Sequence, residues 1–201
     1  MDILTLRAEL NSTNIERYVD TRILDIVPWI FDGNLEAFCA WRNRIKEQTG
    51  MESDSLYVVG SAATGFSMSP NKAGRAFRAM STSSPDRSDV DLAIASEELF
   101  VAAWNTIVNL DRGFKYSAPG EFILRTRENI YWGHLGEKSI PRNTPASRQL
   151  LLLKTACTRE PPFLGYPMSV RIYRRKVDLR GYQVWSVRKL RAVLNSEGAI
   201  L

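Results

Sequence analysis

Two short apolar segments constrain the fold of this chain more than any other feature of its sequence. Residues 56–59 read LYVV and residues 90–95 read VDLAIA, and polar residues or glycine bound each segment. Apolar runs of this length are typical of strands buried within a sheet. Residues 170–174 alternate between apolar and polar side chains and predict a third strand, and residues 122–125 are a weaker candidate for another.

Helical patterns separate these strands and flank them. The spacing of apolar residues predicts that Asn34 and Ser96 begin helices as N-caps and that Gly50 ends one. The pattern as a whole predicts an α/β (α+β) fold, in which helices flank a small mixed sheet. The predicted helices span residues 3–10, 15–27, 35–47, 97–110, 146–158 and 186–194.

Basic residues are concentrated near the C-terminus. The chain has 27 Lys+Arg and 22 Asp+Glu, but residues 142–191 alone hold 12 basic and 2 acidic residues, so the rest of the chain is net acidic. Arginine-rich segments suit phosphate, because a guanidinium binds planar oxyanions in a bidentate way. We expect either contact with RNA, tRNA first, or a solvated basic face. Aromatic residues interleaved with these cations fit base stacking or a core role, namely Tyr166, Tyr173, Tyr182 and Trp185.

Cysteine and histidine usage excludes several kinds of site. Cys39 and Cys157 show no clustering typical of zinc ligands, and their apolar helical surroundings predict two buried free thiols. The single histidine, His134, excludes metal sites with several imidazoles, and we expect a structural or exposed role for it. No signal peptide or membrane span is evident, so we expect a cytoplasmic protein without membrane contact.

The residues that indicate chemistry follow the first strand and open the second. Gly60 and Ser61 come directly after residues 56–59, and Asp89 and Asp91 lie two positions apart at the start of the next strand. The period of a strand places both carboxylates on one face. Such a pair favours a divalent cation with oxygen ligands, and magnesium binds through one or two carboxylates together with substrate phosphates. The glycine and the start of a following helix would accommodate those phosphates.

This arrangement resembles the signature of the DNA polymerase beta nucleotidyltransferase superfamily, in which a glycine-serine turn precedes a strand carrying two acidic residues. The similarity is good over residues 35–110 and extends to small bacterial nucleotidyltransferases of toxin or phage-defence type. The resemblance implies a nucleotidyltransferase fold and transfer of a nucleoside monophosphate from a nucleoside triphosphate. It assigns Gly60 and Ser61 to nucleotide binding, and Asp89 and Asp91 to catalysis and to Mg²⁺ or Mn²⁺.

The chain departs from the family pattern in two ways. Residues 62–88 separate the turn from the first aspartate, a longer stretch than is usual in the family. The family's third carboxylate is also not evident: the third strand carries Arg171 and Tyr173 where an acid is expected. The nearest acidic residues are Glu121, Glu128 and Asp178. The long stretch carries four basic residues, Lys72, Arg75, Arg78 and Arg87.

These observations predict one domain over residues 1–201, with an N-terminal helical segment (1–33), a catalytic core (34–141) and a basic C-terminal part (142–201). The leading hypothesis is a metal-dependent nucleotidyltransferase acting on a hydroxyl of an acceptor, with two magnesium ions between the aspartates and the triphosphate. The missing third acid motivates the alternative, a catalytically inactive module or sensor that binds nucleotide or nucleic acid. A nucleotidyltransferase for sugars or antibiotics would need an acidic acceptor pocket, against which the basic C-terminal part argues.

Overall fold

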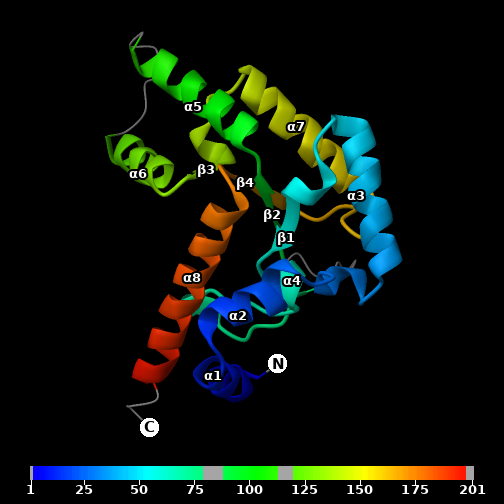
Figure 1. Ribbon diagram of the computed structural model, residues 1–201, viewed down its shortest axis with the longest axis vertical. Coiled ribbons are helices and arrows are strands. Elements are labelled where there is room, and N and C mark those ends of the chain that lie inside the picture. The colour runs from blue at the N-terminus through cyan, green and yellow to red at the C-terminus, as the bar shows by residue number, and fades with distance from the viewer. Residues whose placement is uncertain (1, 79–87, 113–119, 198–201) are drawn as a thin grey trace.

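A mixed four-stranded sheet organises the part of the chain that the structure describes (Figure 1). The computed structural model describes residues 2–78, 88–112 and 120–197, with only the backbone for 110–112 and 120–123. The strands are β1 (Leu56–Val59), β2 (Val90–Ala95), β3 (His134–Gly136) and β4 (Met168–Tyr173), in the order β1-β2-β4-β3. Strands β2 and β4 are parallel, and the two outer pairings are antiparallel. The predicted α/β class with a small mixed sheet is confirmed.

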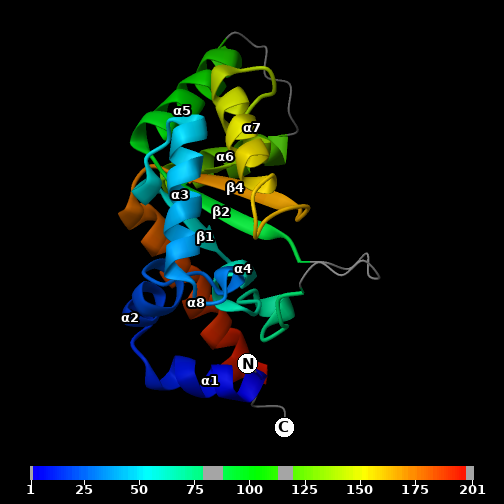
Figure 2. The same cartoon turned by 90° about the vertical axis from the view of Figure 1, so that its right-hand side faces the viewer.

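Three helices cover one face of this sheet, namely α3 (Leu35–Thr49), α5 (Glu97–Arg112) and α7 (Pro145–Thr158) (Figure 2). Leu92 and Ile94 of β2 and Ile172 of β4 point toward them, and all three are buried. Each side chain of this size contributes about 1.5–3 kcal/mol when it leaves water. The alternate residues of the same strands therefore face the other side.

The opposite face packs against the two ends of the chain. Helices α1 (Ile3–Ser12) and α2 (Ile15–Val19) lie beside the last helix, α8 (Lys176–Glu197), as Figure 1 shows in blue and red. Leu6, Tyr18 and Leu190 are among the buried residues of this second core, together with Ala93 and Tyr173 from the sheet. The N-terminal segment and helix α8 thus share one core on the face that carries Asp91.

Shorter elements complete the described chain. Helix α4 (Ser61–Thr64) follows β1, α6 (Gly120–Tyr131) precedes β3, and a π-helical turn covers Asp20–Leu24. The 3-10 turns span Trp29–Phe31, Ser53–Ser55, Pro70–Lys72 and Glu137–Ser139. In the described ranges, no helix combines the length and the apolar character needed to cross a bilayer.

Several sequence expectations about elements were wrong. Residues 122–125 lie in α6 and form no strand, because an apolar run of three residues followed by an arginine fits one helical turn as well as a strand. Strand β3 was missed, since three residues show no period. Helix α8 begins at Lys176, ten residues before the predicted start, where the Arg174 and Arg175 side chains bind Asp178 in its first turn. Helix α2 ends at Val19 and the chain continues as a π-helical turn to Leu24, so the helical segment stops three residues short of the predicted residue 27.

The predicted helix ends are confirmed, and one prediction about the thiols is not. The side chain of Asn34 accepts a hydrogen bond from the backbone N–H of Ala37 at 2.9 Å, and Ser96 Oγ accepts one from Leu99 at 3.2 Å. Cys157 is buried on α7, as expected. Cys39 is exposed, because its position on α3 faces solvent rather than the sheet.

Candidate functional site

Asp91 lies in the middle of the sheet, between β1 and β4. In register it is opposite Val59 on one side and Ser169 on the other. The hydroxyl of Ser169 donates a hydrogen bond of 2.5 Å to Asp91 Oδ1. Gly60 follows β1 with φ 66° and ψ −152°, a conformation that is essentially restricted to glycine. A Cβ at Gly60 would lie 2.7 Å from Asp91 Oδ2, so the absent side chain is what lets this carboxylate occupy its place.

The surroundings of Asp91 disfavour its charged form. Burial raises the pKa of Asp91 above its ordinary value, and the negative charge of Asp89 raises it further. The hydrogen bond from Ser169 and the positive charge of Arg171 oppose that rise in pKa without cancelling it. A partly buried carboxylate with a second one beside it is an environment that a bound cation would stabilise.

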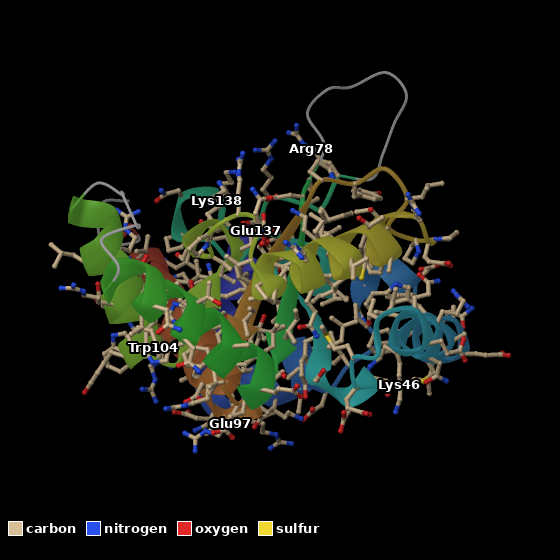
Figure 3. All side chains as sticks on the ribbon, turned by 90° about the horizontal axis from the view of Figure 1, so that it is seen from above. Lys46, Arg78, Glu97, Trp104, Glu137 and Lys138 are labelled. Atoms are coloured by element: carbon tan, nitrogen blue, oxygen red, sulfur yellow. The ribbon has the colours of Figure 1, made fainter. Side chains whose placement is uncertain are left out.

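Asp89 immediately precedes β2 and its side chain is exposed. Two residues that precede Asp89 in the sequence, Arg78 and Ser88, are hydrogen-bonded to each other. Arg78 and Ser88 exchange two hydrogen bonds: the backbone N–H of Arg78 donates to Ser88 Oγ at 3.0 Å, and that of Ser88 donates to the carbonyl of Arg78 at 3.4 Å. Arg78, labelled in Figure 3, is thus held next to the residue before Asp89. Arg87 lies outside the described residues.

Ser61 is the first residue of α4, which spans only four residues. A helix this short has few aligned peptide dipoles, so its N-terminus attracts anions weakly. The geometry therefore gives Gly60 a clear role, close approach to Asp91, and leaves the assignment of Ser61 to nucleotide binding as a prediction.

The residues of β4 that share a face with Asp91 are Ser169, Arg171 and Tyr173. Of the three acids considered for the third carboxylate, Asp178 binds Arg174 at 3.2 Å and Arg175 at 3.3 Å, beyond the far end of β4.

The other two acids do not complete the pair either. Glu128 is exposed on α6, which packs on the opposite edge strand, β3. The side chain of Glu121 lies outside the described part. Among the described residues, no three His, Cys, Asp or Glu side chains gather in a way that could hold a metal.

Sequence reasoning missed Ser169. Its neighbours in the sequence give no signal, and only the parallel pairing of β2 with β4 places its hydroxyl beside Asp91. A polar residue two positions before Arg171, on the same face of the strand, was the one clue that the sequence contained.

Arg171 lies among aromatic rings on the face that carries Asp91. Its guanidinium lies 4.5 Å from the centroid of the Tyr182 ring and 3.4 Å from the hydroxyl of Tyr173. His134 of β3 is buried next to both rings, at centroid distances of 5.0 Å to Tyr182 and 5.7 Å to Tyr173. Burial and the charge of Arg171 lower the pKa of His134 to about 4, and its Nδ1 has no hydrogen-bond partner. The histidine is thus a neutral member of this cluster.

Many basic residues of 142–191 bind acidic residues of the same chain. Arg180 binds Asp20 with two hydrogen bonds, of 2.6 and 2.8 Å. Further pairs join Lys176 to Asp25, Arg188 to Glu16, and Lys154 to Glu137, which is labelled above α7 in Figure 3. The excess positive charge of residues 142–191 is thus partly neutralised by the acidic N-terminal segment, which packs on α8.

In comparisons with known proteins, no family model, curated protein or solved structure matches the chain. What the site can do is therefore argued from its own geometry. Two carboxylates, one of them held by a glycine cradle and a serine hydroxyl, match the oxygen donors that magnesium or manganese takes from a protein when substrate phosphates supply the rest. Among the described residues no third His, Cys, Asp or Glu side chain joins this pair, so the pair fits one such ion better than two.

Proposed function

We propose that this protein is a metal-dependent nucleotidyltransferase, which transfers a nucleoside monophosphate from a nucleoside triphosphate to a hydroxyl of an acceptor. One observation carries the proposal: the carboxylate of Asp91 occupies the space where a side chain of Gly60 would be, with Asp89 two residues before it. A carboxylate held so rigidly beside a second one, in surroundings that disfavour its charge, is suited to a cation-assisted reaction of phosphates.

The residues of the chain would act by positioning. Ser169 fixes the orientation of the Asp91 carboxylate through its hydroxyl, and Gly60 leaves room for it. Asp89, exposed just before β2, would contribute the second carboxylate on the side open to substrate. When bound, Mg²⁺ or Mn²⁺ would neutralise phosphate charge as it develops. The acceptor oxygen forms a bond to the α-phosphorus, the bond to pyrophosphate breaks, and the hydroxyl proton passes to water.

Incubation with labelled nucleoside triphosphates, Mg²⁺ or Mn²⁺, and total RNA tests this function. We expect label transfer by the wild type and loss of at least about a hundredfold in Asp91→Asn and in Asp89→Ala, as for removal of a positioned group in phosphoryl transfer. Asp54→Asn is a matched control, because Asp54 is exposed in the turn before β1. Absence of transfer by the wild type with either metal, or equal transfer by Asp89→Ala, would overturn the proposal.

A second candidate function is nucleotide or nucleic-acid binding without catalysis. The third strand favours it, because Arg171 and Tyr173 stand on β4 where the resemblance leads us to expect an acid, and Ser169, which pairs with Asp91, is not an acid either. Nucleotide binding that needs no metal and survives Asp91→Ala, in a protein without transfer activity, would favour this candidate.

RNA, and tRNA first, stays our proposal for the acceptor, bound through residues 142–191. The ion pairs of Arg180, Lys176 and Arg188 with the N-terminal segment limit which cations are open to it. Arg142 and Arg159 lie on other segments and are the better residues to mutate. We expect Arg142→Gln with Arg159→Gln to weaken RNA binding in a filter assay, while Arg180→Gln mainly lowers stability.

A further inference from the structure

Arg171 stands between two small residues on its face of the sheet. In register, it is opposite Ala93 of β2 and Gly136 of β3. Residues paired across strands point to the same side, so a side chain at Gly136 would lie next to the arginine. The residues that flank Arg171 on β2 and β3 therefore occupy little space.

The space over Gly136 is open. A Cβ built on Gly136 meets no atom within 4 Å, in contrast to Gly60. The backbone of Gly136 has φ −79° and ψ 149°, which any residue adopts, so conformation does not require glycine here. Because residue 136 is a glycine, the space beside Arg171 stays open.

The guanidinium has donors to spare. Its described partners are Tyr173 and Tyr182, through their hydroxyls and the Tyr182 ring, and within the described part of the chain no carboxylate lies within ion-pair distance of it. By contrast, Arg174 and Arg180 are each bound to an aspartate. A guanidinium has five N–H donors in a fork that matches a phosphate, and Arg171 is only partly buried, so a ligand can reach it.

We propose that Arg171 binds a phosphate group of a nucleoside triphosphate in the open space over Gly136, on the face of the sheet that carries Asp91. This inference rests on the proposed function and adds to it the anion-binding group of the site. Arg171 would place on β4, near the carboxylate pair, the positive charge that a second metal ion would otherwise bring to the phosphates. The mostly buried position against the Tyr182 ring suits a small phosphate chain better than a polynucleotide backbone.

The test measures binding of ATP in EDTA by isothermal titration calorimetry, with inorganic tripolyphosphate and a 5′-hydroxyl RNA oligonucleotide as separate probes. We expect binding of ATP and of tripolyphosphate by the wild type, and a loss of at least about tenfold in Arg171→Met, the size of one charge-assisted bidentate contact. Gly136→Leu keeps the arginine but fills the space beside it, and should weaken binding similarly. Gly181→Ala on α8 is the control, since its Cβ meets nothing within 4 Å.

Each outcome separates this inference from the proposed function. Asp91→Asn should retain binding in EDTA while it loses transfer. If neither wild type nor variant transfers label but Arg171→Met still loses binding, the phosphate site stands and the enzymatic function falls. Unchanged binding in both Arg171→Met and Gly136→Leu, binding of the oligonucleotide alone, or no binding by the wild type would overturn the inference. Thermal melting of each variant establishes that it is folded.

Discussion

Gly60 and Asp91 are in such close contact that a methyl group on the glycine would lie 2.7 Å from the aspartate Oδ2. The backbone of Gly60, at φ 66° and ψ −152°, is also one that other residues avoid. We expect Gly60→Ala to lower the free energy of unfolding by about 3 kcal/mol, from backbone strain together with displacement of the Asp91 carboxylate. Urea unfolding followed by circular dichroism measures the loss.

Gly50→Ala is the matched control for that substitution. Gly50 also has a positive φ, 71°, but its Cβ would meet nothing within 4 Å. Its replacement should cost only about 1 kcal/mol, the cost of the backbone conformation alone. Equal losses in the two variants would show that the contact with Asp91 is unimportant.

Ser169→Asp should convert the carboxylate pair into a set of three. The Ser169 hydroxyl is 2.5 Å from Asp91 Oδ1, so a carboxylate there adds a ligand to the same place. We expect Mn²⁺ affinity to rise about tenfold, because affinity for hard cations follows the charge count of the ligands. Titration of Mn²⁺ followed by electron paramagnetic resonance measures it, with Ser169→Asn as the uncharged control. A gain shared by both variants, or by neither, would contradict a metal site at Asp91.

The two thiols should differ in reactivity. Cys39 is exposed, whereas burial raises the pKa of Cys157 to about 12. With Ellman's reagent at pH 8, the native protein should therefore react rapidly at Cys39 alone, and Cys157 should react only after unfolding in guanidinium chloride. In Cys39→Ser the rapid phase should vanish. Rapid reaction of two thiols in the native protein would contradict this arrangement.

Acidification should destabilise the protein through His134. Its pKa is lowered to about 4 in the fold from an ordinary 6.5, so the unfolded chain takes up a proton at a higher pH than the folded one. Stability from the neutral imidazole is complete above pH 6.5 and is lost as the pH falls toward 4. Between pH 7.5 and 5 we expect a loss of about 2 kcal/mol in the free energy of unfolding.

His134→Phe should remove that part of the pH dependence, since phenylalanine keeps the contacts with the Tyr173 and Tyr182 rings and does not titrate. The Arg171 guanidinium, which faces the imidazole from β4, stays charged over this range. Urea unfolding of both proteins at pH 7.5 and pH 5 measures the difference. The same slope in wild type and variant would show that the histidine is not responsible.

The ion pair of Asp20 with Arg180 should stabilise the packing of the N-terminal segment on α8. Hydrogen bonds from Arg180 lower the pKa of Asp20, so its contribution is present above an ordinary aspartate pKa of 3.8 and is lost as the pH falls below it. We expect Asp20→Asn to lower the melting temperature at pH 7, less so in 1 M NaCl, because salt screens partly exposed charges. Asp32→Asn, in the turn after Trp29–Phe31, is the control. Equal effects in low and high salt would contradict an electrostatic role.

Local pattern was enough to predict most elements. Strand β1 has the predicted bounds, Asn34 and Ser96 cap their helices as expected, and Gly50 ends α3. Caps and buried strands depend on neighbouring residues, so a single sequence reports them. Strand β3 and the first ten residues of α8 were missed, because their stability comes from pairing with β4 and from packing against other segments.

For the candidate site, the sequence alone pointed to Asp89 and Asp91 and to a glycine at the end of the preceding strand, because the period of a strand and the needs of a turn are local. It placed both aspartates on β2, whereas the strand begins at Val90 and Asp89 lies just before it. Only the tertiary structure showed that Gly60 makes room for Asp91, that Ser169 holds it and that Arg171 lies on the same face beside an open space. It also paired three basic residues of α8 with acidic residues of the N-terminal segment. These relationships join residues that are far apart in the chain. Strand register and helix packing decide them, and neither leaves a pattern within any one segment of the sequence.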